Sequence, residues 1–363
     1  MIPKKHCLTS HVTTRGISKI RQGKECKPYF TTADDDRTRS IVQGASLADL
    51  SQDSMKWALG RHQKKFGIDP SDDDVFSFVA RMHLIVSPSD GDPELSRYNV
   101  TLAGLLLFGK ERVLERTQFN AETIITFGGE RQRLGRNIIE SVRELIVAEK
   151  SPIRQRCSNA TQDMLLELLK NAYIHRDWRT SGPVMVHISD ILEIQSPGEL
   201  LPPLNVMNLL RCIPCYRNFL LAEGCRQIGL CDKAGRGIGL IFDSALKGGL
   251  EIPIFESANG AFTARLSLSK SDTFAEFVRV RASSLGNMDE ILCLRALLDR
   301  EDMAAEEIAQ VLQRALADTY KVLAGMQKKS MIDARSSSRF ALAGGVRMDI
   351  NNIYSFNQLD MFR

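Results

Sequence analysis

Three polar residues stand four positions apart in the segment LLELLKNAYIHRDW, namely Glu167, Asn171 and His175. On an α-helix this spacing brings the three side chains to one edge, and the leucines between them are left to pack. A carboxylate accepts a proton from water, and an amide oxygen can complete the oxygen shell of a hard cation. The row therefore predicts the metal and water side of a ligand site.

A glycine-rich run, Gly235-Arg236-Gly237-Ile238-Gly239, follows farther along the chain. Glycines at the start of a helix expose backbone amides, which suit a phosphate group. Because the two segments are distant in sequence, we expect a nucleotide pocket assembled from both. The alternatives are a solvated helix face for the polar row and a simple turn with a close helix contact for the glycines.

The ordered motifs ExxxNxxxHRDW, IxSPGxL, RNxxLA and KAGRGI resemble bacterial ATP-binding transcriptional regulators, which combine a GHKL-type ATPase domain with a DNA-binding module. The resemblance runs from about Asp163 to Ser269, and the earlier segment TLAGLLLFGK is also similar to a recurrent segment of these regulators. It implies ATP and magnesium as ligands. By this resemblance Glu167 activates the attacking water and Asn171 ligates Mg²⁺.

The same resemblance implies a larger set of nucleotide-binding residues around the pocket. The better-known GHKL enzymes carry an Asp-x-Gly-x-Gly box whose aspartate binds the adenine amino group, but this chain has QSPGE at that place. Adenine recognition would then pass to Ser196 or to the backbone, and we expect binding with, at most, weak ATPase activity. The cofactor-binding candidates are His175, Ser196, Gly198, Gly235, Arg236, Gly237 and Gly239.

Length and composition are those of a soluble globular protein. The chain has 363 residues, of which 43% are hydrophobic and 25% charged, so two or three domains are expected. Its formal net charge of +4 is too mild to prove nucleic-acid binding and does not oppose it. The sequence lacks a long apolar run and its start lacks the apolar core of a signal peptide, so a cytoplasmic protein without a membrane segment is expected.

The eight cysteines suggest reduced thiols, because the chain is large and carries no secretory signal. Cys212-Ile-Pro-Cys215, followed by Cys225 and Cys231, leaves zinc binding as an alternative. Cys225 and Cys231 stand among leucines and isoleucine, where cysteine commonly serves as a small buried hydrophobe.

A second apparent phosphate motif is expected to be structural. Gly104-Leu-Leu-Leu-Phe-Gly109-Lys110 has the glycine and lysine spacing of a P-loop, but Glu111 replaces the Ser or Thr that would ligate Mg²⁺. Bulky apolar residues also fill the phosphate loop, so we expect a buried element that ends in a Gly-Lys turn.

The predicted fold class is α/β, with a GHKL-like sandwich of helices on one face of a mixed sheet. A hairpin is expected over 183–188 and 191–195, with a closing strand over 261–268 and helices over 46–66, 72–86 and 137–150. The expected divisions are an irregular remnant of a Schlafen-type AlbA-like domain (1–40), an α/β connecting region (41–150), the GHKL-like domain (151–270), a linker (271–285), a winged helix-turn-helix (286–345) and a tail (346–363).

The winged helix is expected from helical spacing at 289–298, 304–312 and 316–328, followed by a strand pair within 331–342. In this arrangement the last helix enters the major groove and the wing contacts the DNA backbone. Leu316 is expected in the core. The alternative is a dimerisation module. The DNA-binding candidates are Thr319, Lys321, Gln327, Lys328, Lys329, Arg335 and Arg339.

The tail segment QLDMF resembles the QLxLF peptide that docks bacterial proteins on the replicative sliding clamp. Gln358 would bond at the pocket mouth while Leu359, Met361 and Phe362 fill a hydrophobic groove. The alternative is a tail that packs on its own domain.

Taken together, these features predict a cytoplasmic, homo-oligomeric regulator that binds ATP, magnesium and DNA. One alternative is a DNA-binding scaffold whose ATPase-like domain has lost its ligand. The other is a replication- or defence-associated ATPase recruited to the clamp.

Overall fold

The computed structural model describes residues 36–71, 74–87, 98–116, 122–147, 159–231, 237–268, 272–281 and 285–350. Gly235, Arg236, the clamp-like motif and nearly all of the expected AlbA-like remnant lie outside these residues. Within the described ranges, no helix combines the length and the apolar character that crossing a membrane requires.

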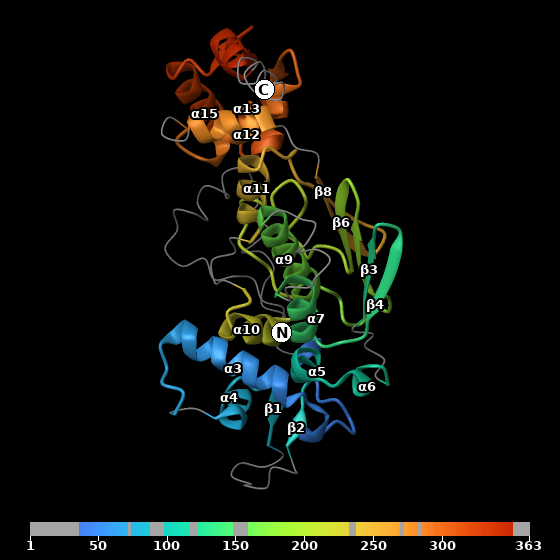
Figure 1. The fold of residues 1–363 in the computed structure, drawn as a ribbon. Coiled ribbons are helices and arrows are strands. Elements are labelled where there is room, and N and C mark those ends of the chain that lie inside the picture. The colour runs from blue at the N-terminus through green and yellow to red at the C-terminus, as the bar shows by residue number, and fades with distance from the viewer. Residues whose placement is uncertain are drawn as a thin grey trace, which may run out of the picture.

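A six-stranded mixed sheet forms the middle of the molecule (Figure 1). Its strand order is β4-β3-β5-β6-β8-β7, in which β3 and β5 are parallel and every other neighbouring pair is antiparallel. The strands are β3 (Thr123–Phe127), β4 (Glu130–Leu134), β5 (Val184–Ile188), β6 (Ile191–Pro197), β7 (Ile254–Ala258) and β8 (Ala261–Ser267).

One face of this sheet is apolar and the other is polar. On β5, Val184, Val186 and Ile188 are buried while His187 between them is exposed. Helices α9 (Asn159–Ile174) and α11 (Gly237–Lys247) lie on one side of the sheet in Figure 1. This mixed sheet with its helices is consistent with an α/β ATPase-like fold, and the expected hairpin is present as β5 and β6.

The sheet extends beyond the expected start of the central domain at residue 151. Strands β3 and β4 come from the 41–150 region, and Thr123 of β3 pairs with Val184 of β5. Buried side chains from both regions also belong to one continuous hydrophobic core. The two regions therefore fold around a shared core.

A helical layer precedes and flanks the sheet. Helix α3 starts at Gln52 instead of residue 46, because Ser51 caps its first turn and the preceding residues form a short 3-10 helix, Leu47–Asp49. A short antiparallel pair, β1 (Ile85–Val86) and β2 (Asn99–Val100), lies beside it. The remaining elements are η2 (Arg37–Arg39), α3 (Gln52–Phe66), α4 (Val75–Arg81), α5 (Leu102–Phe108), α6 (Glu111–Leu114), α7 (Ile138–Val142), the π-helical turn Arg143–Val147 and α10 (Phe219–Gln227).

The P-loop-like segment forms the buried helix α5, as expected. All of its residues are buried. A Cβ at Gly104 would stand 2.3 Å from the carbonyl oxygen of Leu84, so this glycine permits close packing. Lys110 donates from Nζ to the Ala48 carbonyl at 2.7 Å. The glycine and lysine spacing therefore serves the fold.

The C-terminal unit combines a helical cluster with a small antiparallel sheet of order β10-β11-β9. Its core also takes in Phe242 and Leu246 from α11. Leu316, expected in this core, is 38% exposed, because it stands at the first position of α15. The elements are α12 (Asp272–Val280), α13 (Met288–Leu298), β9 (Met303–Ala304), α14 (Ala305–Leu312), α15 (Leu316–Lys328), β10 (Ile332–Ala334) and β11 (Arg339–Leu342).

Candidate functional site

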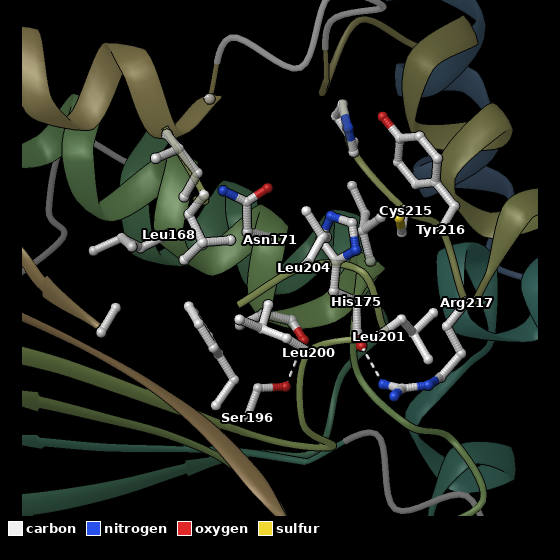
Figure 2. Close-up of a pocket in the computed structure, with 18 of the residues that line it drawn as sticks. Leu168, Asn171, His175, Ser196, Leu200, Leu201, Leu204, Cys215, Tyr216 and Arg217 are labelled. Atoms are coloured by element: carbon white, nitrogen blue, oxygen red, sulfur yellow. Dashed lines mark hydrogen bonds between the residues drawn. The ribbon is translucent and has the colours of Figure 1, made fainter. Parts of the chain in front are cut away.

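A pocket with about 150 Å³ of free volume lies between α9, the sheet, the start of α11 and residues 200–217. Glu167 and Asn171 line it from α9, and His175 lines it from just beyond the end of that helix. Ser196 and Gly198 contribute from the end of β6 and the turn that follows. The polar row and the Ser-Pro-Gly segment thus face one space (Figure 2).

Gly237 is the point at which α11 meets the polar residues of α9 in this pocket. It is the first residue of α11, and a Cβ built on it would stand 3.1 Å from Glu167 Oε2 and 3.4 Å from Asn171 Nδ2. Glycine therefore lets the start of α11 approach both polar side chains closely. A Cβ on Gly239 would meet no atom within 4 Å, so the two glycines differ in their surroundings.

Lys170 pairs with a residue that lines the pocket, and the motifs did not reveal it. Its buried ammonium group forms an ion pair with the Glu167 carboxylate one turn earlier on α9. The i,i+3 spacing of the two charges was visible in the sequence and is the usual geometry of such a pair. Glu167 therefore stands beside a cation that competes for its lone pairs.

The His175 ring stacks against Tyr216, with ring centroids 5.4 Å apart and an angle of 18° between the planes. Burial, assisted by the nearby Arg217 guanidinium, lowers the pKa of His175 to about 4. The ring is therefore neutral near pH 7. Because one ring nitrogen bonds the Cys215 backbone, the ring offers the pocket an aromatic face and its other nitrogen, and no charge for a phosphate.

Ser196 is buried, and its hydroxyl donates to the carbonyl oxygen of Ala172 on α9 at 2.7 Å (Figure 2). A hydroxyl has one proton and two lone pairs. Because the proton is committed to the helix, the oxygen has only acceptor capacity left toward the pocket that it lines. In this respect it resembles a carboxylate oxygen.

Gly198 is required by both backbone conformation and space. Its φ is +106°, and a Cβ there would stand 2.7 Å from Arg217 Nη1 and 2.8 Å from the backbone nitrogen of Asp177. The Asp177 amide donates to the Pro197 carbonyl at 2.8 Å, and the Gly198 amide donates to Gly260 at 2.7 Å. The first bond holds the Ser-Pro-Gly turn against the segment after α9, and the second holds it against the turn between β7 and β8.

Arg217 and Asn218 of the RNxxLA motif cap the C-terminal end of α9. Arg217 donates to the His175 carbonyl at 2.9 Å, a bond drawn in Figure 2, and Asn218 Nδ2 donates to the Ile174 and Arg176 carbonyls at 2.8 and 2.6 Å. The last carbonyls of a helix lack partners within the helix. The motif therefore fixes the end of α9, and with it His175.

Arg176 belongs to the support of the site and does not line the pocket. It is 1% exposed, and its guanidinium lies 4.6 Å from the centroid of the Trp178 ring. One nitrogen donates to the Thr180 carbonyl at 3.2 Å. Burial lowers the pKa of Arg176 to about 10. The HRDW motif thus divides into one pocket residue, His175, and structural residues behind it.

A leucine-rich segment, residues 200–216, forms one wall of the pocket and is called the lid below. The sequence LLPPLNVMNLL within it was not recognised as part of the site, because its leucines have no regular helical or strand spacing. Figure 2 shows Leu200, Leu201 and Leu204 beside His175 and Ser196. The lid residues that line the pocket are Leu200, Leu201, Leu204, Leu209, Cys212, Pro214, Cys215 and Tyr216.

The cysteines act as part of the apolar wall. Burial, with a smaller effect of Cys212, raises the pKa of Cys215 to about 11, and burial raises the pKa of Cys231 to about 11 as well. The described part of the chain holds no group of three or more Cys, His, Asp or Glu side chains placed to bind a metal ion, so the zinc alternative finds no support there.

The DNA-binding candidates are distributed unevenly over the C-terminal unit. Thr319 was predicted to face DNA, but it is fully buried and its hydroxyl donates to the Ala315 carbonyl at 3.2 Å. It stands one turn before Leu323 on the inward face of α15, and this explains the error.

The charged candidates differ in their ion pairs. Lys329 bonds Glu290 at 2.7 Å, Arg339 bonds Asp302 at 2.8 Å and Lys321 bonds Asp318 at 2.7 Å. The exposed candidates outside these pairs are Gln327, Lys328 and Arg335.

Comparison with known proteins supports an ATPase-like domain in the middle of the chain. Residues 182–266 match a protein-family model described as "Putative ATP-dependent DNA helicase recG C-terminal", of the HATPase type. The match runs from just before β5 to the end of β8, and so contains Ser196, the lid and Gly237 but not α9. A domain of this type supports nucleotide binding.

One solved structure with a similar fold is the DIP2311 protein from Corynebacterium diphtheriae. It superposes with a TM-score of 0.65 at 20% sequence identity, over 86% of this chain and 56% of that protein. The chain thus spans little more than half the length of this structural relative, and the likeness concerns the fold alone. No curated protein matches the chain.

Proposed function

We propose that this chain is an ATP- and DNA-binding transcriptional regulator in which nucleotide and magnesium at the central pocket modulate DNA binding by a C-terminal winged helix. The observation that carries the proposal is the approach of Gly237 to Glu167 and Asn171, which puts backbone amides, a carboxylate and an amide oxygen at one pocket. Phosphate, a hard cation and water are the ligands that suit these groups.

The pocket wall fits an adenine ring. Leucine side chains of the lid, together with Ile194 and Phe262 of the sheet, provide apolar faces. Ser196 offers an acceptor where an exocyclic amino group needs one, because its proton is held by Ala172. This accounts for adenine recognition without the aspartate that the better-known GHKL enzymes carry.

The magnesium fit rests on oxygen donors. Asn171 would hold the ion through Oδ1, and Glu167 would orient water near it. When bound, magnesium would neutralise phosphate charge. Lys170 already pairs with Glu167, and this contact opposes the role of Glu167 as a proton acceptor. Binding with weak or no turnover follows, which suits a regulator better than an energy-consuming enzyme.

The DNA-binding part of the proposal rests on α14, the turn after it, α15 and the strand pair β10 and β11. In a winged helix the second helix of the helix-turn-helix enters the major groove, here α15. Gln327 and Lys328 are exposed on α15, and Arg335 is exposed at the turn between β10 and β11. These side chains suit contacts with phosphates and base edges.

Calorimetry of the intact protein with ATP and Mg²⁺ tests the nucleotide part. We expect saturable heat from the parent and from Gln195→Ala, a control on the polar face of the sheet, and a strong loss in Asn171→Ala. If the parent gives no heat, the central domain is a ligand-free scaffold and the proposal is wrong.

Retention on DNA at graded salt concentrations tests the second part. The double variant Lys328→Ala, Arg335→Ala should bind more weakly, and the slope of log K against log salt should fall by about 2, one per phosphate contact. Lys56→Ala with Arg112→Ala removes the same charge from exposed positions far from α15 and serves as the control. Equal losses in both double variants would argue against α15 and the wing.

A further inference from the structure

The lid of the pocket is bonded directly to the turn between α14 and α15. The Leu210 amide donates to Gln313 Oε1 at 2.6 Å, and Gln313 Nε2 donates to the Val206 carbonyl at 3.2 Å. Arg211 Nε donates to the Leu312 carbonyl at 2.9 Å. The lid is therefore hydrogen-bonded to the turn that leads into α15, the proposed recognition helix.

A buried ion-pair cluster strengthens this contact. Arg211 pairs with Asp289 at the start of α13, and the two side chains are 8% and 7% exposed. Asp289 also accepts from Arg314 Nε at 2.9 Å. A buried carboxylate requires such partners. Because Asp289 has two, it stays paired with Arg314 when Arg211 is replaced.

Gln313 has a backbone conformation suited to this position. Its φ is +50°, in the left-handed region, where it ends α14. This conformation is costly for most residues other than glycine, asparagine and aspartate. Glycine or asparagine would be less strained at this position. The glutamine that stands there makes the side-chain bonds to Leu210 and Val206.

A second connection runs through α11. Its first residue, Gly237, meets Glu167 and Asn171, and farther along the helix Phe242 and Leu246 are buried in the core of the C-terminal unit. Leu210 of the lid packs against that same core. The pocket is therefore connected to the C-terminal unit both through its lid and through α11.

We propose that Leu210, Arg211, Asp289 and Gln313 form a latch through which nucleotide in the central pocket changes the position of α15, and hence the affinity for DNA. The inference rests on the proposed function. The lid leucines line the nucleotide pocket, so a bound nucleotide acts on the segment that holds the turn before α15. Linkage then requires DNA to change nucleotide affinity by the same factor.

Two variants open the latch without leaving a buried charge unpaired. Gln313→Gly removes both side-chain bonds and relieves the left-handed strain, and Arg211→Gln removes the bonds to Leu312 and Asp289 while Arg314 still pairs with Asp289. Gln313→Asn keeps a conformation-compatible amide that is one methylene shorter. Gln310→Ala, exposed on α14, is the matched control.

Hydrogen exchange provides the direct test in protein without nucleotide. The amide of Leu210 should be protected in the parent and in Gln310→Ala, and should exchange at least about tenfold faster in Gln313→Gly. Intermediate exchange is expected in Gln313→Asn. Fast exchange of this amide in the parent would overturn the latch, whatever the protein binds.

DNA affinity with and without ATP and Mg²⁺ tests the coupling. We expect about a fivefold or larger change in the parent and in Gln310→Ala, in the range typical of coupled sites, and less than about twofold in Gln313→Gly and Arg211→Gln. Full coupling in the open-latch variants would overturn the latch and leave the proposed function standing. If the parent gives no calorimetric heat with ATP, both the proposed function and the latch are wrong.

Discussion

At the scale of single residues, His175 makes a testable contribution to the pH dependence of stability. Its pKa is about 4 in the folded protein and about 6.5 when unfolded. Between these values the unfolded chain binds more protons, so the free energy of unfolding falls as the pH decreases from 6.5 toward 4. At pH 5 the loss from this group, relative to pH 7, amounts to about 2 kcal/mol.

His175→Phe should keep the ring contact with Tyr216 and lose this part of the pH dependence. Urea denaturation at pH 7 and pH 5 would measure it: the parent should lose about 2 kcal/mol more than the variant over this interval. His187→Phe, on the exposed face of β5, should resemble the parent. If the His175 variant and the parent lose stability equally, the ring is not held neutral by burial.

The residue types in the sequence predicted some of the residues that line this site, but not the residues that hold them in place. Glu167 and Asn171 were identifiable because a carboxylate and an amide recur at helical spacing, and their placement beside Gly237 is a matter of tertiary structure. Arg217 and Asn218 were visible only as a motif. Their bonds to the end of α9 join residues about forty positions apart, which local spacing cannot reveal.

At the scale of elements, the two glycines in the first turn of α11 differ in the space around them, so their replacement by alanine should have different effects. Gly237→Ala places a methyl group 3.1 Å from Glu167 Oε2, whereas Gly239→Ala meets nothing within 4 Å. Alanine is compatible with a helix and favours it by up to about 1 kcal/mol over glycine. We expect Gly237→Ala to lower ATP affinity about tenfold without lowering the melting temperature.

Parallel calorimetry and thermal melts of both variants would check this expectation. Gly239→Ala should bind ATP within about twofold of the parent, because its amide is retained and the added methyl group lies in open space. Equal affinities for the two variants would mean that the nucleotide does not approach α9 beside Gly237.

Secondary structure was predictable where hydrophobic periodicity was strong. The hairpin of β5 and β6 and the helices α13, α14 and α15 lie close to the expected ranges. Strand β4, with the sequence ERQRL, was missed because it is an edge strand whose first four residues are exposed, so it lacks the alternation of a half-buried strand. Strand β7 (IFESA), at the other edge, was missed as well: none of its residues is buried, and apolar and polar residues do not alternate along it.

At the scale of the whole molecule, the expected division at residue 151 separates strands that belong to one sheet. Parallel pairing of β3 with β5 joins segments separated by α7 and α9, and such long-range pairing leaves no local signal. The hydrogen bond of 2.5 Å between Thr123 Oγ1 and the Tyr173 hydroxyl ties the same two regions together. Both regions share the core that contains α5 and α9.

This shared core makes a prediction about fragments. A fragment of residues 151–270 contains the whole ATPase-family match but lacks β3 and β4, so it exposes the edge of β5 and the apolar side chains that pack against α5 and α7. Open strand edges promote aggregation. A fragment of residues 36–268 keeps both, although it uncovers Phe242 and Leu246, which the C-terminal unit otherwise buries.

Size-exclusion chromatography, together with thermal melts followed by circular dichroism, would compare the fragments 151–270 and 36–268. The longer fragment should elute as a folded species with a cooperative transition, and adding residues 269–350 should raise its melting temperature by covering Phe242 and Leu246. The shorter fragment should aggregate or melt without cooperativity. A cooperative transition in residues 151–270 would mean that β5 is stable as an edge strand and that the central domain folds without the region before it.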